Sequence, residues 1–132
     1  MLPFPHRART LATMFRQAIA SVVDGVPGSV GGLVMDADGI SIDTYQAESA
    51  EMDVNSLGIE FGVALSAIRR AAESLETGET REVVIDTERV TTVIRTLGTN
   101  YFLAVAFRPN ANIGKGRFLM RLAGPTLLAE LA

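Results

Sequence analysis

Two pairs of carboxylates have residue types and spacing that could support chemistry. Asp36 and Asp38 stand just before a glycine, as at the start of a calcium-binding loop, but the twelfth position of such a loop is Ala47, where a bidentate Glu is required. Asp86 and Glu88 stand two apart in a β-branched segment, so both point to one face of a strand, as a general acid and base would. No histidine, cysteine or second polar cluster accompanies either pair. We therefore interpret the first pair as turn residues and the second as the solvent face of an edge strand.

Phosphate binding and nucleophilic catalysis also lack a complete set of residues. Gly114-Lys115 imitates the end of a phosphate-binding loop, but Pro109 stands where the first glycine should be, and Gly116 replaces the required Ser or Thr. The chain has no Cys and a single His, His6, which excludes disulfides, thiolate metal sites, cysteine nucleophiles and a histidine-based triad in the core. We predict that the protein is not an enzyme and uses no cofactor and no metal.

Length and composition predict one compact globular domain. The 132 residues are 48% hydrophobic and 20% charged, enough to bury a single core and too apolar for intrinsic disorder. The net charge of −3 and the pI near 5.1 argue against a general nucleic-acid binder. The longest apolar run, Tyr101 to Phe107, is far shorter than the roughly 20 residues of a membrane helix, so we expect no membrane insertion. The first residues have no continuous apolar segment of a secretion signal, and we expect a cytoplasmic protein.

Charge is unevenly distributed along the chain. No Lys or Arg lies between Gln17 and Ile68. Eight acidic residues fall there: Asp24, Asp36, Asp38, Asp43, Glu48, Glu51, Asp53 and Glu60. Such an asymmetry is ordinarily a solvated surface; the alternative is an acidic edge that steers a basic partner.

Apolar residues at helical spacing predict a first helix that Thr10 caps and that ends at Gly25 and Pro27. Its apolar stripe consists of Leu11, Met14, Phe15, Ala18, Ile19, Val22 and Val23. Two strands follow, Val30–Met35 and Ile40–Tyr45, joined by an Asp-Gly turn that is typical of a hairpin.

A pair of glycines, Gly31 and Gly32, interrupts the first of these strands. Glycine weakens a strand interior and often marks a close approach, so we expect another backbone or a helix to lie against it.

A long helix is predicted from the N-cap Asp53 to about Glu76. Its core stripe consists of Val54, Leu57, Phe61, Ala64, Leu65, Ile68, Ala72 and Leu75. Beside that stripe runs a lane of small residues, Gly58, Gly62 and Ser66. Glycine inside a helix costs about 1 kcal/mol relative to alanine, so the lane indicates close packing, either on the domain's own sheet or against a helix of a second chain. Outside the lane lie two apolar residues that the stripe does not bury, Ile59 and Val63.

Three β-rich segments, 82–88, 91–97 and 101–107, are joined by short turns and predict an antiparallel meander. Asn112 then caps a closing helix from Ile113 to Ala123, which Gly124-Pro125 breaks or kinks. Phe118, Leu119 and Leu122 are predicted to form its apolar face, and Lys115 and Arg117 are interpreted as solvated.

The element order α-β-β-α-β-β-β-α predicts an α+β fold with a single-layer five-stranded antiparallel sheet. We expect the long helix on one face and the two terminal helices on the other. The segment from Glu82 to Glu88 begins the meander and is predicted to be an open edge, which invites pairing with its own copy. A two-fold dimer joined there would also bring the two long helices side by side.

Three segments in this order resemble the Roadblock/dynein light chain domain: VDGVPGSVGGLVMDADGI (Val23–Ile40), REVVIDTERVTTVIRTLG (Arg81–Gly98) and NANIGKGRFLMRLA (Asn110–Ala123). The resemblance covers residues 10–123, with a lead-in of residues 1–9 and a short tail of residues 124–132. It is nearest to the bacterial, profilin-like members that regulate gliding and polarity and partner a Ras-like GTPase. It implies a homodimer with a ten-stranded sheet, in which the paired second helices form a platform for a small GTPase.

Carried over by position, the resemblance places the dimer edge at Val83, Val84 and Ile85, and we assign the lane of Gly58, Gly62 and Ser66 to the same interface. Helix phase places the partner-binding platform on Ile59, Glu60, Val63, Ala67 and Arg70. The resemblance implies a regulator of GTP hydrolysis that remodels the residues of the GTPase and donates no catalytic arginine. The alternative is a nucleotide-independent scaffold subunit that joins larger partners, as eukaryotic members do, and a small-molecule sensor is a third possibility.

Overall fold

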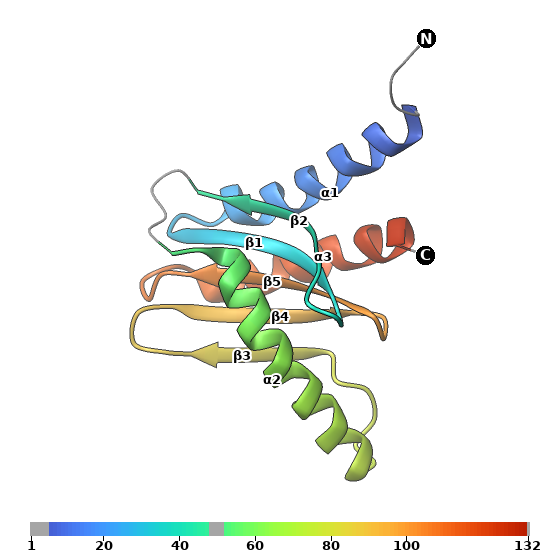
Figure 1. Ribbon diagram of the computed structural model, residues 1–132. Coiled ribbons are helices and arrows are strands. Elements are labelled where there is room, and N and C mark those ends of the chain that lie inside the picture. The colour runs from blue at the N-terminus through green and yellow to red at the C-terminus, as the bar shows by residue number, and fades with distance from the viewer. Residues whose placement is uncertain (1–5, 48–51, 132) are drawn as a thin grey trace.

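The computed structural model describes residues 6–47 and 52–131, with side chains from residue 14 onward. One open sheet has three helices packed on it (Figure 1). The elements in chain order are α1 (His6–Gly25), β1 (Ser29–Asp36), β2 (Ser41–Gln46), α2 (Val54–Ser74), β3 (Glu82–Asp86), β4 (Thr91–Leu97), β5 (Tyr101–Phe107) and α3 (Ile113–Leu131). The five strands are antiparallel, in the order β2-β1-β5-β4-β3. The predicted fold class is therefore confirmed.

The two faces of the sheet hold two separate apolar cores. Alternate residues of a strand point to opposite faces, and β5 is buried on both. The core under α1 and α3 is larger and includes Phe15, Ile19, Val22, Leu97, Leu103, Phe107, Met120 and Leu127. The core under α2 includes Val30, Leu33, Met35, Val54, Leu65, Ile94 and Phe102. Figure 1 shows α2 alone across the near face and the two terminal helices behind the sheet, as predicted.

Helix α1 begins earlier than the sequence predicted. It starts at His6, so the prediction that Thr10 caps it is wrong, although the described members of its stripe are buried or half-buried as expected. The side chains of Thr10 and Leu11 and the first five residues of the predicted lead-in lie outside the described residues, as do Glu48 and Glu51.

The turn between β1 and β2 confirms the interpretation of Asp36 as a turn residue. Its Oδ1 accepts hydrogen bonds from the backbone N–H groups of Asp38 and Ile40, both at 2.9 Å. Gly39 has φ +82°, a conformation that glycine adopts without steric cost. The carboxylate is thus occupied by its own loop.

The glycine pair of β1 confirms the predicted close approach. A Cβ on Gly31 would stand 2.8 Å from the carbonyl oxygen of Tyr45, and one on Gly32 would stand 3.0 Å from Ile19 of α1. The backbone of β1 is therefore in close contact with its neighbours at both positions.

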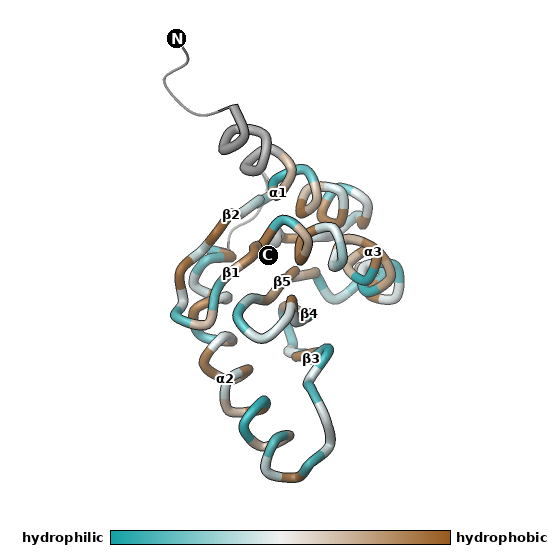
Figure 2. Tube along the Cα trace, turned by 90° about the vertical axis from the view of Figure 1, so that its right-hand side faces the viewer, coloured by the Kyte–Doolittle hydropathy of each residue, from teal (hydrophilic) through white to brown (hydrophobic). Residues whose placement is uncertain are grey.

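Helix α2 begins as predicted, since the Asp53 side chain accepts a hydrogen bond from the N–H of Asn55. Its apolar stripe is covered only in part. Val54 and Leu65 are buried, but Ile68 is 38% exposed and Leu75 is 74% exposed. The prediction that Ile68 and Leu75 belong to the core is wrong for the single chain, because α2 crosses the sheet diagonally and its C-terminal end extends past the last strand, β3 (Figure 2).

Helix α3 differs most from its prediction. It does not end at Ala123 but runs through Pro125 to Leu131, where Leu127 is 1% exposed. Burial of Leu127 in the core offsets the loss of the backbone hydrogen bond that Pro125 cannot donate.

The apolar face predicted for α3 is also wrong in part. Phe118 is 55% exposed and Leu122 is 59% exposed, whereas Met120 is fully buried. The helix turns the row of Gly116, Met120 and Gly124 to the sheet. Gly116 lets it approach closely, because a Cβ at this position would overlap the ring of Phe107.

The sheet has two edges, and β2 is the irregular one. The register shifts opposite Val34 and Met35, which marks a bulge. The bond from the N–H of Ala47 to the carbonyl of Val30 sets the alternation of the ladder, so the N–H of Thr44 points away from β1. That N–H donates to the carboxylate of Asp43, at 2.8 Å, and is therefore occupied within its own chain.

Candidate interaction surfaces on strand β3 and helices α2 and α3

Strand β3 is an edge strand with free backbone groups. Hydrogen bonds from Thr87 N–H to Val90 O and from Thr96 N–H to Arg81 O, both 3.0 Å, fix the alternation of its ladder with β4. Val83 and Ile85 therefore bond to β4, whereas residues 82, 84 and 86 direct their N–H and C=O groups to the open edge. This edge can accept another strand without breaking any bond of its own sheet.

The side chains of β3 point to the two faces of the sheet. Val83 and Ile85 are half-buried and pack against the core under α2. Val84 points to the opposite face, beside α3, and is 46% exposed. The three residues predicted for the dimer edge are thus divided, with Val84 carrying the exposed side chain.

The small-residue lane of α2 faces its own sheet. A Cβ on Gly58 would stand 2.7 Å from Cδ2 of Leu33, and one on Gly62 would stand 3.3 Å from Cζ of Phe102. The close approach that these glycines permit is therefore to β1 and β5, which corrects the assignment of the buried Gly58 to a contact with a second chain. Ser66, the last residue of the lane, is exposed.

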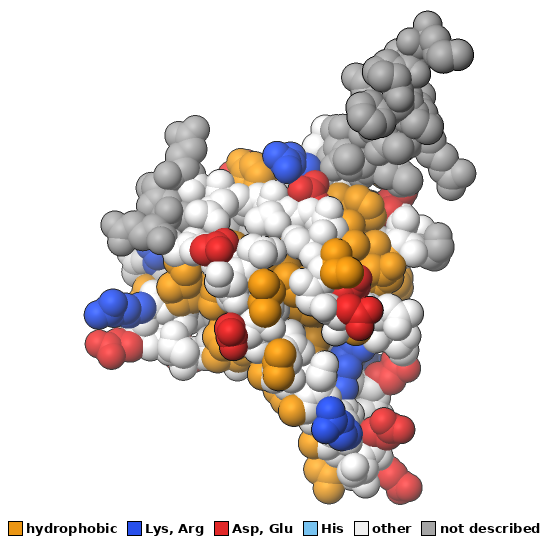
Figure 3. Space-filling view, viewed as in Figure 1, with side chains coloured by type: hydrophobic (Ala, Val, Ile, Leu, Met, Phe, Trp, Pro, Cys, Tyr) orange, Lys and Arg blue, Asp and Glu red, His pale blue; other side chains and the backbone are white. Residues whose placement is uncertain are grey.

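The five residues predicted for the partner platform share one exposed side of α2. They fall within about a third of a helical turn, opposite the buried Leu65. Val63 is 71% exposed and Ile59 is 44% exposed. Glu60, Ala67 and Arg70 are also exposed. Figure 3 shows apolar side chains along this face of the molecule, over α2, with charged residues between them.

The C-terminal half of α2 is anchored by one arginine that sequence reasoning missed. Nη1 of Arg69 donates to the carbonyl oxygen of Thr99 at 2.6 Å, and its Nη2 lies 3.5 Å from the carbonyl oxygens of Gly98 and Tyr101. Burial lowers the pKa of this guanidinium, with a smaller opposing effect from the charge of Glu79. Its Nε is buried and has no hydrogen-bond partner among the described residues.

Arg69 also separates two hollows between α2 and the turn that joins β4 and β5. The smaller, of about 270 Å³, is bordered by Ser66, Arg70 and Asn100, and the larger, of about 620 Å³, by Glu76, Gly78 and Glu79 among others. We interpret Arg69 as the residue that fixes the height of α2 above the sheet.

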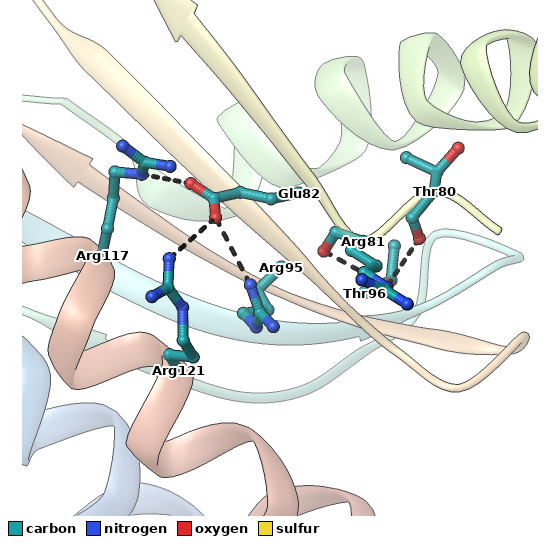
Figure 4. Close-up of polar contacts among 7 residues, drawn as sticks. All are labelled: Thr80, Arg81, Glu82, Arg95, Thr96, Arg117 and Arg121. Atoms are coloured by element: carbon teal, nitrogen blue, oxygen red, sulfur yellow. Dashed lines mark hydrogen bonds and ion pairs between the residues drawn. The ribbon is translucent and has the colours of Figure 1, made fainter. Parts of the chain in front are cut away.

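A second cluster that the sequence did not reveal joins β3 to α3 (Figure 4). Arg95 of β4 and Arg117 and Arg121 of α3 all point toward the carboxylate of Glu82. Arg95 lies 3.3 Å from it and Arg121 4.0 Å, while Arg117 donates directly to Oε1. The hydrogen bond and the charge of Glu82 raise the pKa of Arg117.

The interpretation of Arg117 as solvated is confirmed by its 45% exposed side chain, but the sequence did not reveal that this side chain also pairs with a carboxylate that is only 14% exposed. A signal for this cluster was present in the sequence. Arg117 and Arg121 stand four apart, on one side of a helix, and a tight turn between two strands puts Glu82 opposite Arg95.

The carboxylates that could have supported chemistry are dispersed in the part of the chain that the structure describes. Residues 6–47 and 52–131 contain no group of three His, Cys, Asp or Glu that could hold a metal ion. Within the same residues, no helix has both the length and the apolar character needed to cross a membrane. Asp86 accepts a hydrogen bond from Oγ1 of Thr91 at 2.7 Å, and β3 ends there, so Glu88 lies in the turn rather than beside it on the strand.

Comparisons with known proteins agree with this geometry. The family model of the Roadblock/LC7 domain matches residues 16–107. The solved structure of MglC from Myxococcus xanthus is 42% identical to the chain, with a TM-score of 0.66, and the match covers 89% of this chain and 98% of that one. A search of curated proteins found no match.

Two further solved structures share the fold at lower identity. The gliding protein MglB from Thermus thermophilus is 17% identical, with a TM-score of 0.82 over 98% of this chain and 94% of that one. A Roadblock/LC7 domain from Streptomyces avermitilis is also 17% identical, with a TM-score of 0.77 over 88% of this chain and 96% of that one.

Proposed function

The chain belongs to the Roadblock/LC7 domain family, and from that membership we propose that it is a homodimeric regulatory module that binds a Ras-like small GTPase on its paired α2 helices. The similarity to MglC and to the gliding protein MglB supports a regulatory module of that kind. The dimer and the GTPase are our own inferences, and each has its own supporting geometry.

The observation that carries the proposal is that two incomplete surfaces coincide at one edge of the molecule. Strand β3 offers free backbone groups, and α2 extends past that same strand with Ile68 and Leu75 uncovered (Figure 1). Pairing of two β3 strands about a two-fold axis would place the second sheet beneath the overhanging helix. One contact then uses both the open hydrogen bonds and the exposed apolar residues.

The platform for the GTPase is the outer side of α2. Val63 and Ile59 offer apolar contact area. The side chain of Ala67 is small, so a partner backbone can come close to the helix there. In the proposed dimer two copies of this surface lie beside each other, so the apolar area offered to a partner is larger than that of one chain. The acidic residues before α2 would orient a basic partner and speed its association more than they would strengthen binding.

A nucleotide-independent scaffold is the alternative function. The platform residues include apolar, small and charged side chains but no phosphate-binding loop, so recognition of GTP would depend on the shape that the GTPase itself adopts. A scaffold would bind the GDP and GTP forms equally, and a regulator would prefer one of them.

The dimer is tested by replacing Val84 with proline. The N–H of Val84 points to the open edge, so Val84→Pro removes one donor of the proposed interface and keeps the ladder to β4. We expect a folded monomer by light scattering and circular dichroism, whereas Val84→Thr, which keeps the donor and the β-branch, stays dimeric. A dimeric proline variant would show that another edge or face joins the chains.

The platform is tested with the small GTPase encoded nearest to this protein, loaded with GDP or with a GTP analogue. Val63→Glu puts a charge at the centre of the apolar surface, and we expect it to abolish co-elution with the GTPase while the chain stays dimeric. Ile40→Glu, a matched change at a 61% exposed position in the turn between β1 and β2, should leave binding intact. Equal loss in both variants, or no binding by the unmodified chain, would reject the platform for that partner.

A further inference from the structure

The face of the sheet opposite α2 carries an excess of positive charge next to β3. Glu82 is the single carboxylate within 4.0 Å of Arg95, Arg117 and Arg121 among the described residues, so two positive charges stay uncompensated. The side chains of Arg117 and Arg121 are 45% and 56% exposed, whereas that of Glu82 is 14% exposed. We call these four residues the basic corner. Its central carboxylate fixes the positions of the guanidiniums without neutralising them.

Exposed apolar side chains surround the basic corner. Val84 of β3 is 46% exposed and points to the same face as Glu82. Leu128 is 42% exposed and follows Arg121 by about two helical turns, so it lies on the same side of α3. Phe118 is adjacent to Arg117 on the outer side of the helix and is 55% exposed. Apolar and basic groups thus alternate along one surface.

The proposed dimer makes a groove of this surface. Neighbouring strands are about 4.8 Å apart, and α3 lies over β4 and β5, so two α3 helices on either side of a β3–β3 seam would stand roughly 15–20 Å apart. The axes of packed helices lie about 8–10 Å apart, so two α3 axes at this separation leave room for one further helix packed between them. The floor of the groove would be formed by Glu82, Val84 and Asp86 of both chains, and each wall would carry Arg117, Arg121 and Leu128.

We propose that this groove binds one amphipathic helix of a partner protein whose polar side is acidic. The charge complementarity identifies the occupant, because the three arginines of each chain outnumber the two carboxylates on this face, Glu82 and Asp86. The width admits one helix on the two-fold axis, so the stoichiometry is one helix per two chains. The inference rests on the proposed dimer and adds a second docking surface on the face opposite the GTPase platform.

The test uses a fluorescent peptide of about 15 residues, the length at which an isolated helix begins to form, with Glu and Leu at amphipathic spacing. We expect saturable binding at one peptide per two chains. Raising the salt from about 0.1 M to about 1 M shortens the Debye length from about 10 Å to about 3 Å and should weaken binding markedly. A peptide with Lys in place of Glu should not bind.

The variants remove two positive charges from the groove side and one from the platform side. The double change Arg117→Gln with Arg121→Gln leaves Glu82 paired with Arg95 and should weaken peptide binding about tenfold. Arg70→Gln, on the platform side of α2, should not change it. Light scattering on the same samples gives the oligomeric state.

Three outcomes would overturn the groove. They are equal binding by the double variant, a stoichiometry of one peptide per chain in a dimeric sample, and binding to phosphatidylglycerol vesicles without binding to the peptide. A monomeric sample would instead reject the dimer itself, so the failure of this inference is distinguishable from the failure of the proposed function.

Discussion

Single glycines set how closely the helices of this protein lie on its sheet. Gly116 is the clearest case, because a Cβ at this position would overlap the ring of Phe107, which is fully buried. A fully buried ring has no room to move away, so α3 must shift if the residue grows.

We expect Gly116→Ala to lower the free energy of unfolding by about 1–3 kcal/mol, the cost of overpacking a core. Gly114→Ala is the control in the same helix, where the new Cβ would lie 3.5 Å from Oδ1 of Asn112, an ordinary contact. Gly114→Ala should raise the free energy of unfolding by up to about 1 kcal/mol, because alanine has a higher helix propensity than glycine. Urea denaturation of both variants measures the difference, and equal effects would show that α3 does not approach Phe107 as described.

For single residues, the sequence showed which side of a helix is apolar more reliably than which residues the fold buries. It placed Val63 and Ile59 on an uncovered side of α2, where both are exposed. It also predicted an apolar face of Phe118, Leu119 and Leu122, of which only Leu119 is half-buried. The structure instead buries the row of Gly116, Met120 and Gly124. This side faces the sheet because Gly116 leaves space for the ring of Phe107, and the sequence alone does not reveal that these two residues meet.

Among the elements, α3 shows how tertiary packing overrides local preference. Proline inside a helix removes a hydrogen bond and ordinarily ends the helix, yet α3 continues for six residues beyond Pro125. The burial of Leu127 keeps the last turns in place.

We expect Pro125→Ala to raise the free energy of unfolding by about 2–3 kcal/mol. Interior proline costs about 3 kcal/mol relative to alanine, and the greater chain entropy of the unfolded variant offsets up to about 1 kcal/mol of that gain. Thr126→Ala, the neighbouring change, should alter stability by less than about 0.7 kcal/mol. Lower stability in the Pro125 variant, measured by thermal unfolding, would mean that the helix does not run through this position.

Most of the elements could be predicted because periodicity and turn residues determine them locally. The bounds of β4 and β5 match their predictions, and Asp53 caps α2 as expected. The apolar stripe of α2 was also predicted along its whole length. The sequence did not predict that the sheet buries only part of this stripe. Periodicity shows which side of a helix is apolar, and it does not show where the sheet beneath that side ends.

The whole molecule has two unequal faces at its β3 edge, one with apolar groups on α2 and one with basic groups on α3. Both faces would be completed by the same pairing of chains, so assembly and stability should be linked. A partner chain that binds only the folded form stabilises it by about 2.7 kcal/mol at a concentration one hundred times the dissociation constant.

We therefore expect the midpoint of thermal unfolding to rise with protein concentration. A dilution series over about two orders of magnitude, followed by circular dichroism, measures this dependence. Val84→Pro should unfold at the same temperature at every concentration. A midpoint of the unmodified chain that does not change across the series would contradict a reversible dimer.

The irregular margin at β2 limits how far such strand pairing can extend. The bulge opposite Val34 and Met35 distorts that margin, and the carboxylate of Asp43 already holds the outward N–H of Thr44. When two copies join through β3, the free ends of the combined sheet are both β2 strands. Because neither β2 edge accepts a further strand readily, assembly through strand pairing would stop at two chains and would not lengthen into an amyloid-like filament.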